Sequence, residues 1–200
     1  MRAELKAEWQ RLERVLKGFG LPVDPLPGVP DAELDAWERA FGLSLDRDLR
    51  DLYRFTRGSR SSTPWLCVRT DELALLTLMD PKESLEFAGV QPLAVEEEDR
   101  IEWQGRRLNS DPRIAPFLRH PKWLPFAEFN GLGTALMLDG APGSSGTAGQ
   151  LIAFQHDPDS LWWQAASFLE LFARSNALYA EHGTMLLEDE EEDDAGEQED

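Results

Sequence analysis

Residues 123–156 read WLPFAEFNGLGTALMLDGAPGSSGTAGQLIAFQH, and this stretch decides the fold class. It holds three apolar runs, at 123–127, 134–139 and 150–156, which are separated by segments rich in glycine, asparagine and serine. Short apolar runs that are bounded by turn residues are typical of β-strands. The stretch therefore predicts antiparallel strands that pair with one another across two turns.

Helical periodicity precedes these strands. In the segment 3–19 the apolar residues recur at spacings of three and four, which is typical of a helix with one buried face. These residues are Leu5, Trp9, Leu12, Val15, Leu16 and Phe19. A proline-rich segment at 21–30 must interrupt regular structure. Two further helices are expected beyond it, over about 30–42 and 46–58, each of which ends at a glycine.

The middle of the chain is less regular. Residues 65–69 are short and β-prone, so they predict a first strand, whereas 71–77 fit a short helix or a strand equally. The region at about 79–121 is rich in charge and contains several prolines. It predicts a charged insertion made mainly of loops, with a short strand at 100–103.

A last helical pattern closes the fold. Residues 160–179 carry an apolar stripe and predict a helix that is capped by Asp159 or Ser160. Helices, then strands, then a final helix indicate an α+β fold rather than an alternating α/β fold. No internal repeat interrupts this order.

Size and cysteine content set the broad class. The chain has 200 residues, of which 42% are hydrophobic, enough for one sizeable core without disulfides. The single cysteine, Cys67, favours a reducing, cytoplasmic location. No signal peptide and no membrane span are expected. We expect an N-terminal amphipathic helix at 1–20, a folded domain at 21–182 and an acidic tail at 183–200.

The net charge of −18 is the unusual feature of the composition. Ten of the 38 acidic residues lie in 188–200, so the remaining 28 oppose 20 basic residues and leave a net charge of −8. A tail this polar and self-repelling is expected to be disordered. The acidic body disfavours nucleic acid and anionic membranes and would attract a basic protein, although the acidity could also serve solubility alone.

Candidate catalytic groups are few. The histidines are His120, His156 and His182. They share no metal-ligand spacing with one another or with Cys67, so we expect no metal and no cofactor. His156 and Asp139 could do acid–base work, which keeps a small hydrolase as an alternative. Carboxylates at strand ends more commonly cap turns, and we therefore predict no catalytic residues.

Two ordered sets of motifs resemble a known family. The first is LPGVPDAELDAWE at 26–38, which is followed by Gly42 and Gly58. The second comprises the strand segments 123–126, 136–139 and 149–154, then His156, Asp157 and an aromatic-rich helix through Phe168. This order is similar to the SUKH superfamily, also called the Smi/Knr-like or cell-wall-assembly-regulator family. The resemblance covers about 22–179, and its middle part matches poorly.

Membership of this family implies an α+β fold with a single antiparallel sheet, flanked by N-terminal helices and a C-terminal helix. In bacteria it implies immunity proteins that bind and neutralise toxins, many of them nucleases. In fungi the same domain belongs to a regulator of wall synthesis. The expected function is therefore a non-catalytic protein-binding module whose partner is a basic toxin domain. A regulatory scaffold that binds a housekeeping partner is the alternative.

Two groups of residues are candidates for contacting a partner. The predicted acidic face comprises Glu38, Glu96, Glu97, Glu98, Asp99 and Asp139. Such a patch would occlude a cationic nuclease site and speed association. Trp162 and Trp163 are adjacent, so both cannot face the core of one helix, and an exposed aromatic is a favoured interface anchor. The alternatives are that one of them covers the sheet edge or that they join a homodimer.

Overall fold

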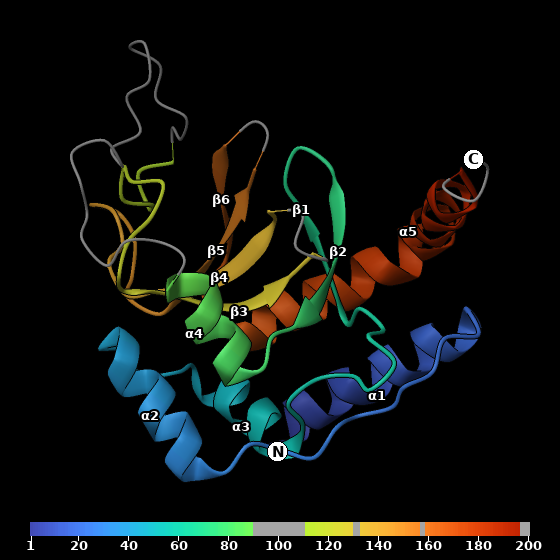
Figure 1. Ribbon diagram of the computed structural model, residues 1–200, viewed down its shortest axis with the longest axis horizontal. Coiled ribbons are helices and arrows are strands. Elements are labelled where there is room, and N and C mark those ends of the chain that lie inside the picture. The colour runs from blue at the N-terminus through green and yellow to red at the C-terminus, as the bar shows by residue number, and fades with distance from the viewer. Residues whose placement is uncertain (90–110, 130–132, 157–158, 197–200) are drawn as a thin grey trace.

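The computed structural model describes residues 1–89, 111–129, 133–156 and 159–196, with side chains as far as Gly183. These residues form five helices and six strands (Figure 1). The helices are α1 (Ala3–Gly18), α2 (Asp31–Phe41), α3 (Arg47–Phe55), α4 (Pro81–Gly89) and α5 (Phe168–Gly196). The strands are β1 (Leu66–Arg69), β2 (Leu73–Leu78), β3 (Trp123–Glu128), β4 (Ala135–Asp139), β5 (Gln150–Gln155) and β6 (Ser160–Ala165).

The six strands form one antiparallel sheet in which each strand pairs with its neighbours in chain order. The predicted pairing of the runs at 123–127, 134–139 and 150–156 is confirmed by the β3–β4 and β4–β5 ladders. The β3–β4 register shifts between Pro125 and Ala127. Proline has no N–H to donate to a ladder, so a bulge is a common place for it within a sheet. The α+β fold class and its single flanked sheet are likewise confirmed.

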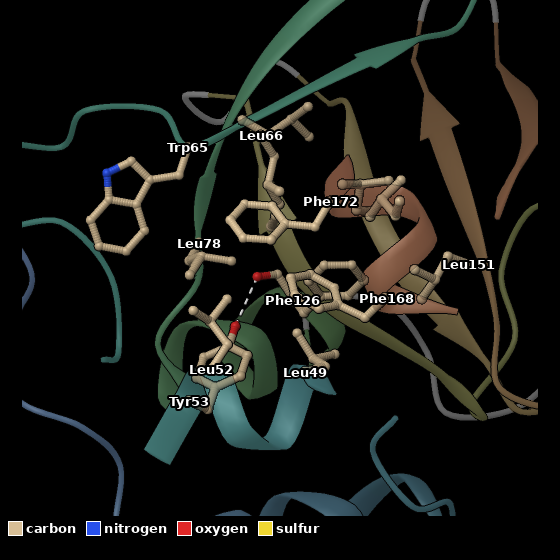
Figure 2. Close-up of a cluster of buried hydrophobic side chains, with 14 of the residues drawn as sticks. Leu49, Leu52, Tyr53, Trp65, Leu66, Leu78, Phe126, Leu151, Phe168 and Phe172 are labelled. Atoms are coloured by element: carbon tan, nitrogen blue, oxygen red, sulfur yellow. Dashed lines mark hydrogen bonds between the residues drawn. The ribbon is translucent and has the colours of Figure 1, made fainter. Parts of the chain in front are cut away.

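The main core lies between the sheet and the helices α1, α2, α3 and α5. Figure 2 shows the part of it to which α3, the sheet and α5 contribute. We call this side of the sheet the inner face. Its buried side chains include Leu124, Leu136, Leu138, Leu151 and, from α5, Phe168 and Phe172. Full burial of one leucine or phenylalanine contributes roughly 1.5–3 kcal/mol. The Tyr53 hydroxyl crosses from α3 to donate to the Phe126 carbonyl oxygen at 2.9 Å, which ties the helical layer to β3.

The opposite side of the sheet, the outer face, carries a second and smaller apolar cluster. Side chains alternate between the two faces along a strand, so residues next to inner-face positions point outward. The side chains that point outward include Met137, Ile152, Leu161 and Trp163. The segment 111–120 covers them with buried Ile114 and Ala115.

The predicted closing helix over 160–179 was wrong in its first part. Residues 160–165 form β6, where Phe154 pairs with Leu161 and Ile152 with Trp163. A short apolar run fits a helix or a strand by its pattern alone, and here pairing with β5 decides. The helix begins at Phe168 and is capped by Ser167, whose hydroxyl accepts from the Glu170 N–H at 3.3 Å, and not by Asp159 or Ser160.

The loops predicted after Met79 also need correction, because Pro81–Gly89 is helix α4. The Asp80 carboxylate accepts from the Lys82 N–H at 2.9 Å, and Glu83 reaches back to the Asp80 N–H at 2.6 Å. This reciprocal arrangement is a capping box, and proline is well suited to the first helical position. The ambiguous segment 71–77 is largely strand β2. The strand expected at 100–103 lies outside the described residues.

Helix α5 extends into the acidic segment as far as Gly196. The expected disorder of the segment 183–200 stays a prediction. No helix within the part of the chain that the structure describes is long and apolar enough to cross a membrane.

Candidate protein-interaction surface

The outer face brings together residues from five strands in one cross-strand row. Successive register pairs join Thr77 to Glu128, Glu128 to Ala135, Ala135 to Phe154 and Phe154 to Leu161. Paired residues point to the same side of a sheet, and adjacent strands lie about 4.8 Å apart. Glu128 and Phe154 are therefore roughly 10 Å apart on the same face.

Trp163 lies on this face in β6, next to Phe154, and both side chains are partly exposed. The guanidinium carbon of Arg113 sits 3.8 Å from the centre of the Trp163 ring, which is a cation–π arrangement. A carboxylate holds Arg113 there, since its Nη2 lies 2.6 Å from Asp111 Oδ2. The hydrogen bond from Arg113 also lowers the pKa of Asp111. Aromatic residues and arginine are enriched at protein interfaces, so Trp163, Arg113 and Phe154 form a candidate contact platform.

Trp162 points to the inner face because side chains alternate along β6. Its ring packs against the main core, and its Nε1 donates to the Ser160 hydroxyl at 3.1 Å. The two adjacent tryptophans are thus divided between the faces of an edge strand. The structure leaves both partly exposed, and Trp163 is the one that belongs to the candidate platform.

Asp139 does not belong to an exposed acidic face, which corrects the prediction made for it. Its side chain is fully buried at the end of β4. One carboxylate oxygen accepts from Trp123 Nε1 and the Ala141 N–H, each at 2.8 Å, and the other accepts from Gln150 Nε2 at 2.8 Å. Burial raises the pKa of this carboxyl, and the three donors oppose the rise. Asp139 therefore fixes the connection between β4 and β5.

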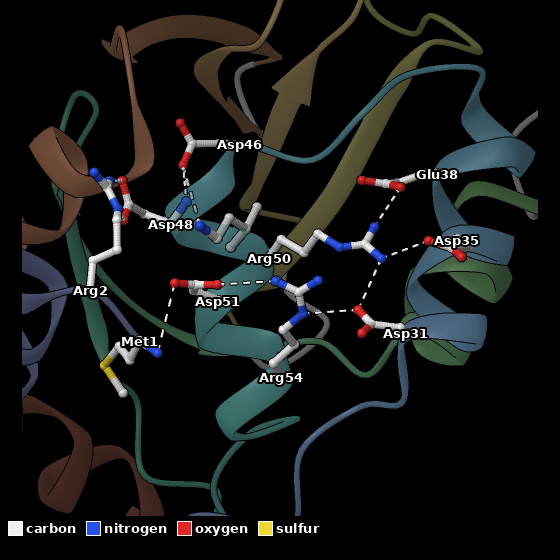
Figure 3. A network of polar contacts seen from close by, with 11 residues as sticks. Met1, Arg2, Asp31, Asp35, Glu38, Asp46, Asp48, Arg50, Asp51 and Arg54 are labelled. Atoms are coloured by element: carbon white, nitrogen blue, oxygen red, sulfur yellow. Dashed lines mark hydrogen bonds and ion pairs between the residues drawn. The ribbon is translucent and has the colours of Figure 1, made fainter.

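Glu38 is held by internal partners between α2 and α3 (Figure 3). One of its oxygens accepts from the Leu45 N–H at 2.8 Å and the other from Arg50 Nη1 at 2.6 Å. Arg50 also binds Asp31 at 3.0 Å and Asp35 at 2.6 Å. The Glu38 side chain is only 18% exposed, so its main contribution in this structure is to join two helices.

Replacing Glu38 with alanine is expected to lower the free energy of unfolding by about 1–2 kcal/mol, because the Leu45 N–H loses its acceptor. Chemical denaturation followed by circular dichroism measures this. The matched control is Glu86→Ala at an exposed position on α4, where a change within about 0.5 kcal/mol is expected. Equal effects of the two substitutions would contradict the structural role of Glu38.

Asp139 and His156, the acid–base pair considered for a hydrolase, lie near opposite ends of β5. Asp139 pairs with Gln150 at the start of β5, whereas His156 follows the end of that strand. Six residues of strand span roughly 20 Å, so the two side chains cannot act on one substrate atom. His156 Nδ1 instead lies 2.6 Å from Oδ1 of Asp159, three residues further along the chain.

Glu96, Glu97, Glu98 and Asp99 lie outside the described residues. Within the described ranges, no group of three or more histidine, cysteine, aspartate or glutamate side chains is arranged to hold a metal ion. The absence of a cofactor stays a prediction.

Three residues of the outer face were not singled out from the sequence: Arg113, Glu128 and Phe154. Because side chains alternate along 150–155, the sequence could have placed Phe154 on the other face of the sheet from Leu151. No pattern could have placed Arg113, because its contact with Trp163 joins a loop to a distant strand.

Comparisons with known proteins agree with this architecture. A family model described as SMI1 / KNR4 family (SUKH-1) matches residues 28–174, which include the whole sheet. The chain is also similar to the cell wall biosynthesis/cell cycle regulator smi1 of Schizosaccharomyces pombe (strain 972 / ATCC 24843), with 26% identity over 195 residues. That alignment covers 92% of this chain and 37% of the yeast protein, so the chain spans little more than a third of that relative's length.

Proposed function

Because the chain belongs to the SMI1 / KNR4 family (SUKH-1), we propose that it acts by binding another protein rather than by catalysing a reaction. The observation that carries this proposal is the outer face, where Trp163 and Phe154 are partly exposed and Arg113 stacks on Trp163. Aromatic residues and arginine dominate the energetics of protein interfaces. The platform rests on a rigid ladder of paired strands, so little conformational entropy is lost when a partner binds.

We propose further that the partner is a basic toxin domain and that the chain is its immunity protein. The net charge of −18 supports this assignment, since an acidic protein is steered toward a cationic partner. A regulatory scaffold is the second candidate. The similarity to a cell wall biosynthesis/cell cycle regulator of Schizosaccharomyces pombe favours it.

Co-expression separates these two candidates. If a toxin gene adjoins the gene for this chain, the toxin domain is expressed with and without the chain, and both survival and co-purification are scored. Protection together with a stable complex is expected of an immunity protein. Absence of both would contradict that role and leave the regulatory scaffold as the proposed function.

Replacing Trp163 with alanine is expected to weaken binding to the co-purified partner by at least about tenfold, because a central tryptophan typically contributes 2 kcal/mol or more. Isothermal titration calorimetry with the purified pair measures this. Trp163→Tyr keeps an aromatic ring beside Arg113 and should lose less. Phe55→Ala removes a 42% exposed aromatic from the helical layer and is the control that should leave affinity unchanged. Unchanged affinity of a folded Trp163→Ala protein would exclude this platform as the binding surface.

A further inference from the structure

A cleft of about 390 Å³ opens where the outer face meets the start of α4. Its walls come from the loop after α3, from the ends of β2 and β3, and from the first turn of α4. The polar residues that matter here are Arg57, Thr77, Asp80, Lys82, Glu83 and Glu128. Leu26 and Leu78 add an apolar wall. Since a water molecule occupies about 30 Å³ in the liquid, the cleft has room for a side chain.

Two of the groups that could attract an anion into this cleft are already engaged: the Arg57 guanidinium and the backbone N–H groups at the start of α4. Arg57 binds Asp80 at 2.7 Å and lies 3.6 Å from Glu33. At the start of α4, the Lys82 N–H donates to the Asp80 carboxylate and the Ser84 N–H to the Asp80 carbonyl, each at 2.9 Å. An anionic ligand would have to displace these contacts. It would also meet the carboxylates of Asp80, Glu83 and Glu128, with Lys82 as the one remaining cation among the described residues of the lining, so the cleft is poorly suited to phosphate or carboxylate.

Glu128 is in the opposite situation. Its side chain is partly buried, and among the described residues no hydrogen bond or ion pair is made by its carboxylate. Burial raises the pKa of Glu128, and the nearby charge of Glu83 raises it further. A cation that entered the cleft would relieve both effects, since it would replace lost solvation and offset the repulsion between the two carboxylates.

We propose that this cleft binds an arginine side chain of the partner protein, whose guanidinium donates to Glu128 and Glu83. The proposal rests on the protein-binding function proposed above and deepens it by locating one anchor. Arginine fits better than lysine because its planar guanidinium presents a fork of donors to carboxylates. Leu26 and Leu78 can cover the methylene groups of its stem.

The position of the cleft links it to the candidate platform. Glu128 lies in the same cross-strand row as Phe154, at roughly 10 Å. Residues three apart in a polyproline II segment lie on the same side of the chain and are separated by about 9 Å. A partner segment could therefore insert an arginine at Glu128 and place an apolar side chain on Phe154.

The test uses the whole chain and a small probe, N-acetyl-L-arginine amide, followed by two-dimensional NMR. Saturable shifts are expected for the backbone amides of Gly58, Thr77 and Glu128. N-acetyl-L-citrulline amide has nearly the same shape without the charge and should produce none. Glu128→Gln should weaken binding of the arginine probe about tenfold, and the matched control Glu86→Gln on the exposed side of α4 should not.

The pH dependence provides a second readout. Binding needs the ionised carboxylate, so it should weaken as the pH falls through the pKa of Glu128. Because that pKa is raised, the loss should begin at a higher pH than for an ordinary glutamate. The absence of saturable shifts, equal shifts with the citrulline probe, or unchanged affinity of Glu128→Gln would each overturn the proposal. None of these results depends on the natural partner, whereas failure of co-purification would count against the proposed function alone.

Discussion

Replacing Asp139 with alanine is expected to destabilise the protein by about 3–5 kcal/mol, the largest effect we predict for one side chain. The substitution leaves three donors without an acceptor at the end of β4: the Trp123 indole, the Ala141 N–H and the Gln150 amide. Each unsatisfied buried donor costs about 1–3 kcal/mol, and water that enters the space recovers part of that cost. Chemical denaturation of the purified variant measures the loss. A loss below about 1 kcal/mol would contradict the structural role assigned to Asp139.

Asp139→Asn distinguishes the hydrogen bonds from the charge. Asparagine keeps one acceptor oxygen and should therefore lose less stability than alanine. Burial raises the pKa of Asp139 above the ordinary 3.8, so the folded protein holds this proton more tightly than the unfolded chain. Ionisation of Asp139 should lower stability as the pH rises from 3.8 through the folded pKa, and Asp139→Asn should lack this component. The opposite trend would be an increase in the stability of the wild type relative to Asp139→Asn over that pH range. It would show that the three donors affect the pKa of Asp139 more than burial does.

Gly28→Ala is the second substitution with a large expected effect, about 2–4 kcal/mol. A Cβ atom at this position would lie 1.9 Å from the Arg54 carbonyl oxygen and 2.6 Å from its carbon. The segment cannot simply move away, because the neighbouring Val29 N–H donates to the Tyr53 carbonyl at 2.8 Å and the Val29 side chain is buried. The new methyl group must therefore displace the end of α3 or break this contact.

Gly18→Ala is the matched control for Gly28→Ala. A Cβ atom at Gly18, in the last turn of α1, would meet nothing within 4 Å. Alanine is the better helix former, so this variant should be neutral or more stable by up to about 1 kcal/mol. Thermal unfolding of the two variants beside the wild type makes the comparison. If Gly28→Ala were as stable as Gly18→Ala, the close approach at Arg54 would be relieved without cost.

Local periodicity predicted the helical layer well. The stripe Leu5, Trp9, Leu12 and Leu16 is buried along α1, and Leu34 and Trp37 are buried in α2. A residue that recurs every third or fourth position is directed to one side by helix geometry alone. The three runs at 123–127, 134–139 and 150–156 likewise became paired strands, since turn residues on both sides left them no length for a helix.

Local periodicity did not decide residues 160–165. The pattern SLWWQA satisfies a helical stripe with the residues that follow it, yet it equally fits a strand. Pairing with β5 supplied the ladder hydrogen bonds and placed Trp162 and Trp163 on opposite faces. The roles of the two tryptophans could not be assigned before that choice was made.

The carboxylates show which properties the sequence determines by itself and which depend on the tertiary structure. It determined how many there are, how many gather in the acidic tail, and that the body remains acidic. Only the tertiary structure decided that Asp139 is buried among three donors, that Glu38 binds Arg50, and that Glu128 faces a cleft. The physical reason is that strand register and helix packing bring a carboxylate into contact with residues that are distant in the chain. Composition and periodicity depend only on residues that are near one another in sequence.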